Sequence, residues 1–451
     1  MPVSAARAAA FDILLRVERE SSYASELLHS AAYARLSPRD HALATELVMG
    51  VLRWRSRLDD EIALASSKPL SRLDDEVLTA LRLAVFQLRW LDRVPQRAAL
   101  HESVEWVKRA RKRSAAAFVN AVLRKLAAAQ KREVAAAREC GSPEKLARLF
   151  AHPLWLVERW AREYGLDAAR QICEHSQSVP ATAIRLCTST AEAKLIGEGI
   201  ILAPGSLMAS ARRVTSGDIT KTRLFREGEI VIQDEASQLV AALVGASSRK
   251  RSRILDCCAA PGGKTLALAD RNPGATITAV ELHPHRARLL RRLLETSHAS
   301  ERVEVVVADA RNLPISVPFD RVLADVPCSG TGTLGRNPEI KWRITPADLK
   351  ELQARQSAIL CSALAQVALG GRLIYSTCSL EKEENEDVVE QALTANNSFH
   401  LLDCRAELDR LRAGGELTWD DVASLTRGPY LRTIPGIHPC DGFFAAILER
   451  T

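Results

Sequence analysis

The chain has 451 residues, enough for two or three domains, and its 47% hydrophobic and 26% charged residues are typical of a soluble globular protein. It contains no run of about 18 apolar residues and no apolar signal-peptide core, which excludes a membrane-spanning helix and predicts a cytoplasmic protein. The ten cysteines form no C-x-x-C pair and no set with histidine at zinc spacing, which indicates individual reduced thiols and no bound metal.

Residues 1–130 carry apolar side chains at the i, i+3, i+4 and i+7 spacing of amphipathic helices, without strand-like alternation. The pattern is clearest over residues 6–17, 77–88 and 118–126. The sequence therefore predicts an all-helical bundle domain over residues 1–130. An Ala/Lys/Arg-rich stretch that ends at Gly141, Ser142 and Pro143 predicts a linker over residues 131–150.

The net charge of +7 is unevenly distributed, because residues 1–150 carry +8 and the remainder carries −1. The first third is therefore the better candidate for binding a polyanion, although a solvated basic surface explains the charge alone equally well. Five of the six residues from Lys108 to Arg113 are basic, and we favour a patch that contacts RNA phosphates over a solvated helix end. The predicted RNA-binding residues of this patch are Lys108, Arg109, Arg111, Lys112 and Arg113.

Residues 151–225 have a mixed pattern. A helix is predicted over Leu154–Tyr164, and a strand is predicted within Ala181–Cys187 after a proline. Turn residues follow at Pro204-Gly205 and over Ser216–Asp218. This part of the chain is predicted to be a small α+β domain.

From residue 226 onward, short apolar runs alternate with segments of helical length, which predicts a mostly parallel sheet with helices on both faces. The predicted strands lie within Ser252–Asp256, Thr276–Leu282, Val303–Asp309, Arg321–Val326 and Gly371–Ser376. Ligands of such sheets bind beyond the carboxyl ends of the strands, so chemistry is expected there. The predicted fold is multidomain, with an all-α bundle, a small α+β domain and an α/β Rossmann-like domain over 226–451.

The first of these strands leads into a loop of small residues and glycines that lets a ligand approach the backbone. Its end, Gly262-Gly263-Lys264-Thr265, is similar to a phosphate-binding P-loop, but that motif requires glycine at the position of Cys258. The dinucleotide pattern G-x-G-x-x-G is also absent.

The second and third strands end at Glu281 and Asp309, where carboxylates can accept hydrogen bonds from ribose hydroxyls and an adenine amino group. Either acid alone would more often be an ordinary surface or capping residue. Together, behind a glycine-rich loop, they indicate a nucleoside cofactor without phosphates, which is the chemistry of S-adenosylmethionine.

Two cysteines follow the fourth and fifth strands, Cys328 in D-V-P-C-S-G-T-G and Cys378 in S-T-C-S. Either alone would more often be a small buried hydrophobe, but both lie in polar turns that should face one cleft. Thiols in such a cleft suit the transfer of a methyl group to carbon 5 of cytosine, because this carbon becomes nucleophilic when a thiolate adds to carbon 6. Nitrogen 3 must then gain a proton or a strong hydrogen bond, for which Asp325 is suitable, and a second thiol is useful for product release.

The motifs D-C-C-A-A-P-G-G-K-T, D-V-P-C-S-G-T-G and S-T-C-S together resemble the RNA cytosine-5 methyltransferase family. Gln233–Gln238 and Asp441–Phe444 extend the resemblance to about residues 226–451. It implies a class I methyltransferase domain in which Cys378 is the nucleophile and Cys328 assists release. The DNA-modifying relatives attack from the Pro-Cys cysteine, so the opposite assignment stays open.

The resemblance also implies which residues line the cofactor and base site, with Lys264 contacting the target nucleotide as well. These residues are Cys258, Ala259, Ala260, Pro261, Gly262, Gly263, Lys264, Glu281, Asp309 and Asp325.

The first third resembles the NusB family of helical RNA-binding and antitermination proteins through Phe118–Lys125. A NusB-like domain ahead of the catalytic domain resembles a group of bacterial 16S rRNA methyltransferases, with which His152–Leu156 and Asn337–Trp342 agree. Cys187 departs from that group, in which asparagine is common, and the departure concerns the RNA contacts of the middle domain and not the chemistry.

The resemblance implies a monomeric enzyme that acts on a specific cytosine of 16S rRNA, either free or in a partly assembled small subunit. Two alternatives remain: a tRNA cytosine-5 methyltransferase, and a non-catalytic RNA-binding or antitermination factor.

Overall fold

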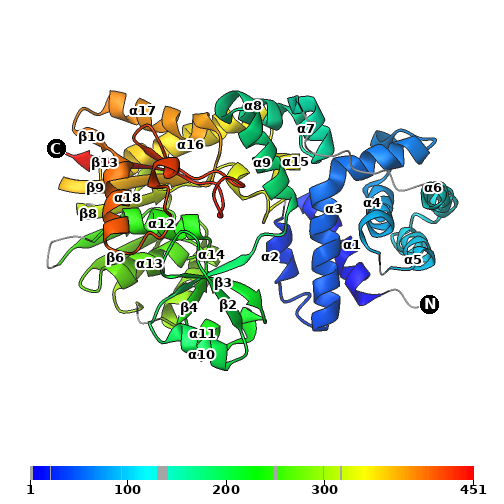
Figure 1. Ribbon diagram of the computed structural model, residues 1–451, viewed down its shortest axis with the longest axis horizontal. Coiled ribbons are helices and arrows are strands. Elements are labelled where there is room, and N and C mark those ends of the chain that lie inside the picture. Colours follow the sequence, from blue (N-terminus) through cyan, green and yellow to red (C-terminus); the bar gives the residue numbers. More distant parts are fainter. Residues whose placement is uncertain are drawn as a thin grey trace. The chain divides into compact units, whose positions relative to one another are not determined.

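The computed structural model describes residues 4–20, 22–92, 94–129, 141–246, 251–297, 299–314 and 317–451, and Figure 1 labels its elements. The chain divides into two compact units. Unit 1 comprises Met1–Val179 and the separate segment Leu334–Arg343, and unit 2 comprises Pro180–Thr333 and Ile344–Thr451. No helix in the described part of the chain is long and apolar enough to cross a membrane.

Unit 1 is helical, without strands among its described residues. Its α-helices are α1 (Ala5–Glu20), α2 (Ala24–Leu28), α3 (Pro38–Ala65), α4 (Asp75–Trp90), α5 (Gln96–Arg109), α6 (Ala116–Ala128), α7 (Pro143–Leu149), α8 (Leu154–Tyr164), α9 (Leu166–Gln177) and α15 (Ile340–Arg343). Aliphatic side chains such as Ile13, Leu47, Leu81 and Leu123 are fully buried in one core. The helical bundle predicted for residues 1–130 is confirmed.

Local sequence features set where two of these helices begin. The hydroxyl of Ser37 accepts a hydrogen bond from the first turn of α3, and Pro38 occupies the first helical position. Ser142 caps α7 in the same way. Helix α7 therefore begins inside the predicted linker 131–150, of which residues 131–140 lie outside the described residues.

Helices α7–α9 belong to unit 1, whereas the sequence placed residues 151–225 together in one domain. Trp160 of α8 is buried, and Nε2 of Gln177 at the end of α9 donates to the backbone oxygen of Arg53 at 3.0 Å. The division between the units lies at Pro180. An amphipathic pattern predicts α8 with its correct bounds, but it does not show which partner buries the apolar face.

The segment Leu334–Arg343, which follows the Pro-Cys motif in the sequence, is also part of unit 1. The fully buried Lys341 donates from Nζ to the backbone oxygen of Arg53 at 3.0 Å, and Nε1 of Trp342 donates to the backbone oxygen of Leu52 at 2.6 Å. These bonds anchor a short stretch of the second half of the chain on helix α3.

The described residues of unit 2 form two sheets. The smaller one has the order β2-β3-β1-β4, and all of its pairings are antiparallel. Its strands are β1 (Thr182–Leu186), β2 (Ile201–Pro204), β3 (Ala211–Ser216) and β4 (Ile230–Ile232), with helices α10 (Ala191–Gly197) and α11 (Arg223–Arg226). The strand predicted within Ala181–Cys187 is confirmed as β1.

The larger sheet has the order β11-β12-β13-β9-β8-β5-β6-β7, with β10 paired to β13. The five predicted runs correspond to β5 (Arg253–Asp256), β6 (Thr276–Glu281), β7 (Val303–Val307), β8 (Phe319–Asp325) and β9 (Val367–Thr377), which are mutually parallel. The antiparallel part comprises β10 (Phe399–Leu402), β11 (Thr426–Arg427), β12 (Tyr430–Arg432) and β13 (Phe444–Arg450), and it was not predicted.

Helices cover both faces of the larger sheet (Figure 1). Helices α12 (Glu235–Leu243), α13 (Gly263–Arg271), α14 (Pro284–Glu295) and α18 (Cys404–Ala413) share one apolar core with the sheet, and α16 (Pro346–Leu364) and α17 (Glu386–Ala395) share the other. Neighbouring residues of β8 point into opposite cores, because Leu323 belongs to the first and Val322 to the second. A strand buried on both faces reads as a continuous apolar run, which in β8 is limited to Val322–Ala324.

Glu235, at the start of α12, connects the two sheets of unit 2. Its buried carboxylate accepts hydrogen bonds from the backbone N–H groups of Ser206 at 3.0 Å and Met208 at 3.0 Å, which lie between β2 and β3. The motif Gln233–Gln238 therefore has a structural role in holding the smaller sheet against the larger one.

Candidate active site

The two cysteines predicted to share a cleft are in contact. Strands β8 and β9 are parallel neighbours with Asp325 opposite Ser376, so the turns that follow them start at the same edge of the sheet. We refer to residues 326–330 as the Cys328 turn and to residues 377–381 as the Cys378 turn. The Sγ atoms of Cys328 and Cys378 lie 3.3 Å apart, within hydrogen-bonding distance for sulfur.

Glycine allows the two turns to approach each other this closely. A Cβ atom on Gly332 would lie 2.2 Å from the backbone oxygen of Gly442 and 2.8 Å from that of Cys378. The N–H of Gly332 instead donates to the Cys378 oxygen at 2.9 Å. Any side chain at position 332 would therefore push the backbone next to the cysteines apart.

The environments of the cysteines differ. Cys328 and Cys378 are both half-buried. The hydrogen bond that the Cys328 thiol shares with Cys378, together with burial, raises the pKa of Cys328 well above its usual range, so its thiol stays protonated. Burial also raises the pKa of Cys257 and of Cys258 well above the usual range, which makes both unreactive as nucleophiles.

Asp325 and Lys264 form an ion pair beside the cysteines. Nζ of Lys264 lies 2.8 Å from Oδ2 of Asp325, and Ser376 Oγ donates to Oδ1 of Asp325 at 2.7 Å. The same ammonium lies 5.0 Å from the centre of the Phe443 ring. Burial acts to lower the pKa of Lys264. The negative charges of Asp325, Cys378 and Asp256 outweigh that effect and raise the pKa of Lys264. Lys264 is therefore a cation at the centre of the site.

The predicted cofactor loop, Cys258–Lys264, follows β5 and includes the first two residues of α13, and the peptide bond between Ala260 and Pro261 is cis. Gly262 has φ of +118°, and a Cβ atom there would lie 2.6 Å from Cδ1 of Leu290 on α14. Glycine is thus required both by the backbone conformation and by the close packing of the loop on α14.

Glu281 and Asp309 lie where the sequence placed them, at the ends of β6 and β7. Glu281 is buried, and its Oε1 accepts from the N–H of His283 at 2.8 Å. Asp309 is more exposed, and Arg311 lowers the pKa of Asp309 by hydrogen-bonding to it. A ligand that uses Asp309 would have to share it with Arg311.

Asp256, at the end of β5, was not predicted as a site residue. Its Oδ2 accepts from Thr265 Oγ1 at 2.7 Å, whereas its Oδ1 is buried without a hydrogen-bond partner among the described residues. Burial raises the pKa of Asp256 to about 6. Its position beside the loop was visible in the sequence, because it directly precedes the first cysteine of D-C-C-A-A-P-G-G-K-T.

These residues fit a nucleoside cofactor. A buried carboxylate at the end of β6, a second carboxylate beyond β7 and an unpartnered carboxylate oxygen on Asp256 lie at the same edge of the sheet as the loop, whose residues before Lys264 have only small side chains. Acceptors of this kind suit ribose hydroxyls and amino groups rather than phosphates. No group of three potential ligands arranged to hold a metal ion is present among the described residues.

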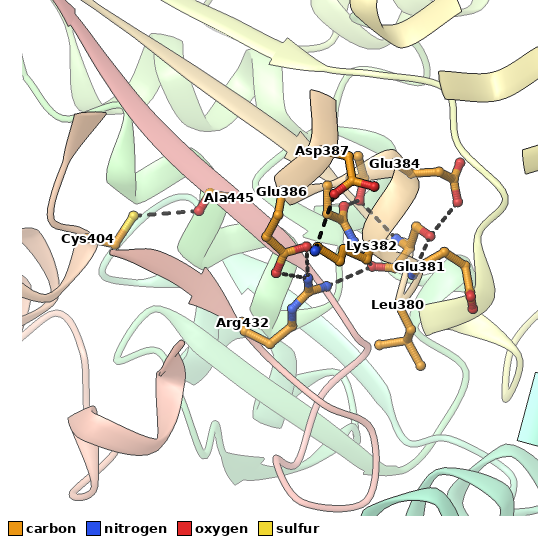
Figure 2. Close-up of polar contacts among 12 residues, drawn as sticks. Leu380, Glu381, Lys382, Glu384, Glu386, Asp387, Cys404, Arg432 and Ala445 are labelled. Atoms are coloured by element: carbon orange, nitrogen blue, oxygen red, sulfur yellow. Dashed lines mark hydrogen bonds and ion pairs between the residues drawn. The ribbon is translucent and has the colours of Figure 1, made fainter. Parts of the chain in front are cut away.

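Two further residues behind the Cys378 turn were missed. Arg432 on β12 is buried, makes a bidentate ion pair with Glu386 at 2.8 and 3.0 Å, and donates from Nη1 to the backbone oxygen of Ser379 at 3.1 Å. Figure 2 shows this guanidinium directed toward Glu386, with Glu384 nearby. The acidic run after S-T-C-S could have indicated Glu384. No pattern in the sequence indicates that Arg432 pairs with a member of this run.

The predicted basic patch lies at the end of α5 in unit 1. Lys108 pairs with Glu105 at 2.7 Å, and Lys112 pairs with Asp74 at 3.1 Å. Arg109 lies over the ring of Trp106, and Arg111 and Arg113 are exposed. The patch is partly neutralised, with its free charge mainly on the arginines.

Comparisons with known proteins agree with this description. A family model for 16S rRNA methyltransferase RsmB/F matches residues 245–449, and a model for the NusB family matches residues 4–128. Probable ribosomal RNA small subunit methyltransferase B of Bacillus subtilis is 32% identical over 467 residues, with 100% of both chains covered. Ribosomal RNA small subunit methyltransferase B of Vibrio cholerae is 31% identical, with 98% of this chain and 97% of that protein covered.

Solved structures share the fold. The crystal structure of PH0851 has a TM-score of 0.81 and 24% identity, covering 100% of this chain and 99% of that chain. A methyltransferase homolog protein from Pyrococcus horikoshii has a TM-score of 0.56 and 25% identity, covering 69% of this chain and 99% of that chain. The NusB-like bundle and the Rossmann-like methyltransferase domain predicted from the sequence are confirmed.

Proposed function

The chain belongs to the RsmB/F family of 16S rRNA methyltransferases, and on that premise we propose that it methylates carbon 5 of a specific cytosine in 16S rRNA. The family resemblance predicted from the sequence is confirmed, and the chain is an S-adenosylmethionine-dependent RNA methyltransferase. The observation that carries the finer proposal is the pair of thiols 3.3 Å apart at the carboxyl edge of the sheet.

Paired thiols match the chemistry of cytosine carbon 5 more closely than that of other RNA positions. An exocyclic amine, a ring nitrogen or a ribose hydroxyl has a lone pair that can attack a methyl group directly. Carbon 5 has none, and it becomes nucleophilic only after a sulfur has added to carbon 6. The covalent bond must be broken afterwards, which gives a second thiol a role.

We assign the attack to Cys378 and the release to Cys328. Cys378 forms the bond from sulfur to carbon 6, and the electron pair of the 5,6 double bond moves toward carbon 5. Cys328, which burial and its hydrogen bond keep protonated, is a poor nucleophile at neutral pH. After the methyl group has been added, carbon 5 loses its proton to solvent water, and the electrons of that C–H bond re-form the 5,6 double bond as the bond from carbon 6 to sulfur breaks. Cys328 donates its thiol proton to the departing Cys378 sulfur, 3.3 Å away, and regains a proton from the solvent.

Asp325 and Lys264 serve the pyrimidine ring as its charge changes. When sulfur adds to carbon 6, negative charge develops over nitrogen 3 and oxygen 2 of the ring. Because Asp325 is ionised in the ion pair, the proton that nitrogen 3 gains is assigned to the Lys264 ammonium and is passed through the Asp325 carboxylate, which neutralises the charge on the ring. Their 2.8 Å contact keeps both groups oriented before RNA binds.

S-adenosylmethionine, when bound, supplies the electrophilic methyl group. We assign its binding to the backbone of the loop Cys258–Lys264, to Glu281 for the ribose hydroxyls and to Asp309 for the adenine. The free Oδ1 of Asp256 adds an acceptor at the same edge.

The RNA substrate is the part of the proposal that rests on relatives. The basic patch of the NusB-like domain and the small α+β domain would position the RNA through its phosphates, without reading sequence. The target base must leave its stack to reach the thiols, which favours free or partly assembled small subunits. We propose that the enzyme acts as a monomer.

The test is methylation of total bacterial RNA with purified protein and labelled S-adenosylmethionine, followed by mapping of the labelled nucleotide. We expect label at one cytosine of 16S rRNA, and more on naked rRNA than on mature subunits. Label confined to tRNA would replace the proposal with a tRNA cytosine-5 methyltransferase. RNA binding without any methyl transfer would support a non-catalytic role instead.

A further inference from the structure

We propose that Glu384 is the positioning residue that holds the Cys328 turn and the Cys378 turn in register. Glu384 closes the short helix η7 (Lys382–Glu384) behind both turns, and its side chain is fully buried. It lies six residues after Cys378 and far from Cys328 in the sequence, and the neighbours of both cysteines converge on its carboxylate.

One side of this carboxylate holds the Cys328 turn. The N–H of Ser329, the residue after Cys328, donates to Oε1 of Glu384 at 2.8 Å. The hydroxyl of Ser329 donates to Oε2 through a short hydrogen bond. Two bonds to a single residue fix both the position and the orientation of the peptide that carries the Cys328 side chain.

The Oε2 atom of Glu384 also holds the Cys378 turn. The hydroxyl of Ser379, the residue after Cys378, also donates to Oε2 of Glu384. The hydroxyls of Ser329 and Ser379 are themselves 3.0 Å apart. The residue after each thiol is thus bound to one carboxylate oxygen, which ties the separation of the two turns to a single atom.

Two anchors keep Glu384 in place. From α16, Nε2 of Gln356 donates to Oε1 of Glu384 at 2.8 Å and to the backbone oxygen of Pro327, before Cys328, at 3.0 Å. From β9, the hydroxyl of Tyr375 donates to the backbone oxygen of Glu384 at 2.6 Å. The backbone and the carboxylate of Glu384 are therefore both held by α16 and β9, which do not belong to either turn.

A buried carboxylate with four hydrogen-bond donors is more than a folding contact needs, because an apolar residue could fill the same space. Its geometric effect is specific to the cysteines, because every donor except Gln356 comes from a residue adjacent to a thiol. We infer that Glu384 keeps Cys328 within reach of the adduct on Cys378. This role in release rests on the proposed function, whereas the spacing itself does not.

The spacing of the thiols is measurable without RNA. When the intact protein is treated with diamide, the two thiols lose two protons and two electrons, an S–S bond forms, and the diamide N=N bond is reduced to a hydrazine. In Glu384→Gln the amide places a donor against the donors of the serines. We expect the Cys328–Cys378 disulfide, quantified by mass spectrometry of digests, to form about tenfold more slowly than in the wild type.

The matched control is Glu390→Gln, which makes the same chemical change at an exposed position of α17 and should oxidise like the wild type. If E384Q does not fold, Ser329→Ala removes one of the bonds and should slow disulfide formation about threefold. Disulfide formation at the wild-type rate in a folded E384Q, or in S329A when E384Q does not fold, overturns the proposal.

The second readout uses RNA. We expect E384Q to lower the steady-state methylation rate about tenfold or more while the first covalent adduct still forms within about threefold of the wild-type rate. Equal losses of adduct formation and turnover would contradict a role in release. If the wild type forms no adduct at all, the proposed function fails, and the diamide result still decides the positioning role.

Discussion

The Nζ atom of Lys264 lies 2.8 Å from Oδ2 of Asp325, which joins the last residue of the predicted cofactor loop to the residue that precedes the Cys328 turn. Both side chains are partly buried, and Ser376 fixes the other carboxylate oxygen. The loop proposed to bind the cofactor and the strand end proposed to bind the base therefore share one ion pair.

That pair predicts a non-additive effect on catalysis. Lys264→Met and Asp325→Asn should each lower the methylation rate by about a hundredfold or more, because the surviving partner loses its counter-charge. The double variant should lose less than the product of the two, with a coupling energy of about 1–3 kcal/mol. Steady-state rates of the four proteins test this, and strictly additive losses would show that the residues act independently.

The two cysteines should give opposite covalent phenotypes. Cys378→Ala should abolish both turnover and any protein–RNA adduct, because it removes the sulfur assigned to attack carbon 6. Cys328→Ala should lose turnover but retain an adduct stable to denaturing electrophoresis. Cys361→Ala changes an exposed cysteine and should behave like the wild type. A trapped adduct in C378A rather than C328A would exchange the assigned roles.

Asp256 should make stability depend on pH. Burial raises the pKa of Asp256 from 3.8 to about 6, so the folded protein favours the neutral carboxyl. The stability that this preference gives is complete below pH 3.8 and is lost as the pH rises through about 6. Asp256→Asn cannot ionise, so its free energy of unfolding relative to the wild type should increase by up to about 3 kcal/mol between pH 4 and pH 8. Urea unfolding at several pH values measures the difference.

The control for that experiment is Asp409→Asn, at an exposed position of α18. Its effect on the free energy of unfolding should stay within about 0.5 kcal/mol over the same range. A pH-independent difference for D256N would mean that Asp256 is ionised in the folded protein throughout.

The buried ion pair between Arg432 and Glu386 should matter far more than an exposed one. Arg432→Met removes the guanidinium that pairs with the half-buried carboxylate of Glu386 and one of the two donors to the oxygen of Ser379, and should lower the free energy of unfolding by about 3–5 kcal/mol. Arg405→Met breaks the exposed pair with Asp409 and should cost less than about 1 kcal/mol. Chemical denaturation measures both, and equal effects would exclude a special role for Arg432.

The basic patch should contribute to RNA affinity through charge alone. Replacing Lys108, Arg111 and Arg113 with alanine should weaken RNA binding and reduce the slope of log affinity against log salt by about two to three. The matched control replaces the exposed Arg35, Arg39 and Lys145 of unit 1. Equal losses in both triple variants would indicate a general electrostatic attraction rather than a defined patch.

The sequence by itself determined the secondary structure of the site and the identity of its reactive groups. Helix α8 was predicted with its observed bounds, and Cys328 and Cys378 were placed at one edge because parallel strands bring their carboxyl ends together. These features are local, since an apolar period or a turn residue next to a strand can be read without knowing what packs against it.

The tertiary structure decided which distant residues meet. Glu384 and Arg432 support the Cys378 turn only because α17, β12 and β9 pack around it, and the segment Leu334–Arg343 is anchored on α3 by contacts that no local pattern encodes. The free oxygen of Asp256 likewise became visible only once its neighbours were in place. Such contacts depend on which elements pack together, which a hydrophobic period cannot specify because it shows that a face is buried but not by what.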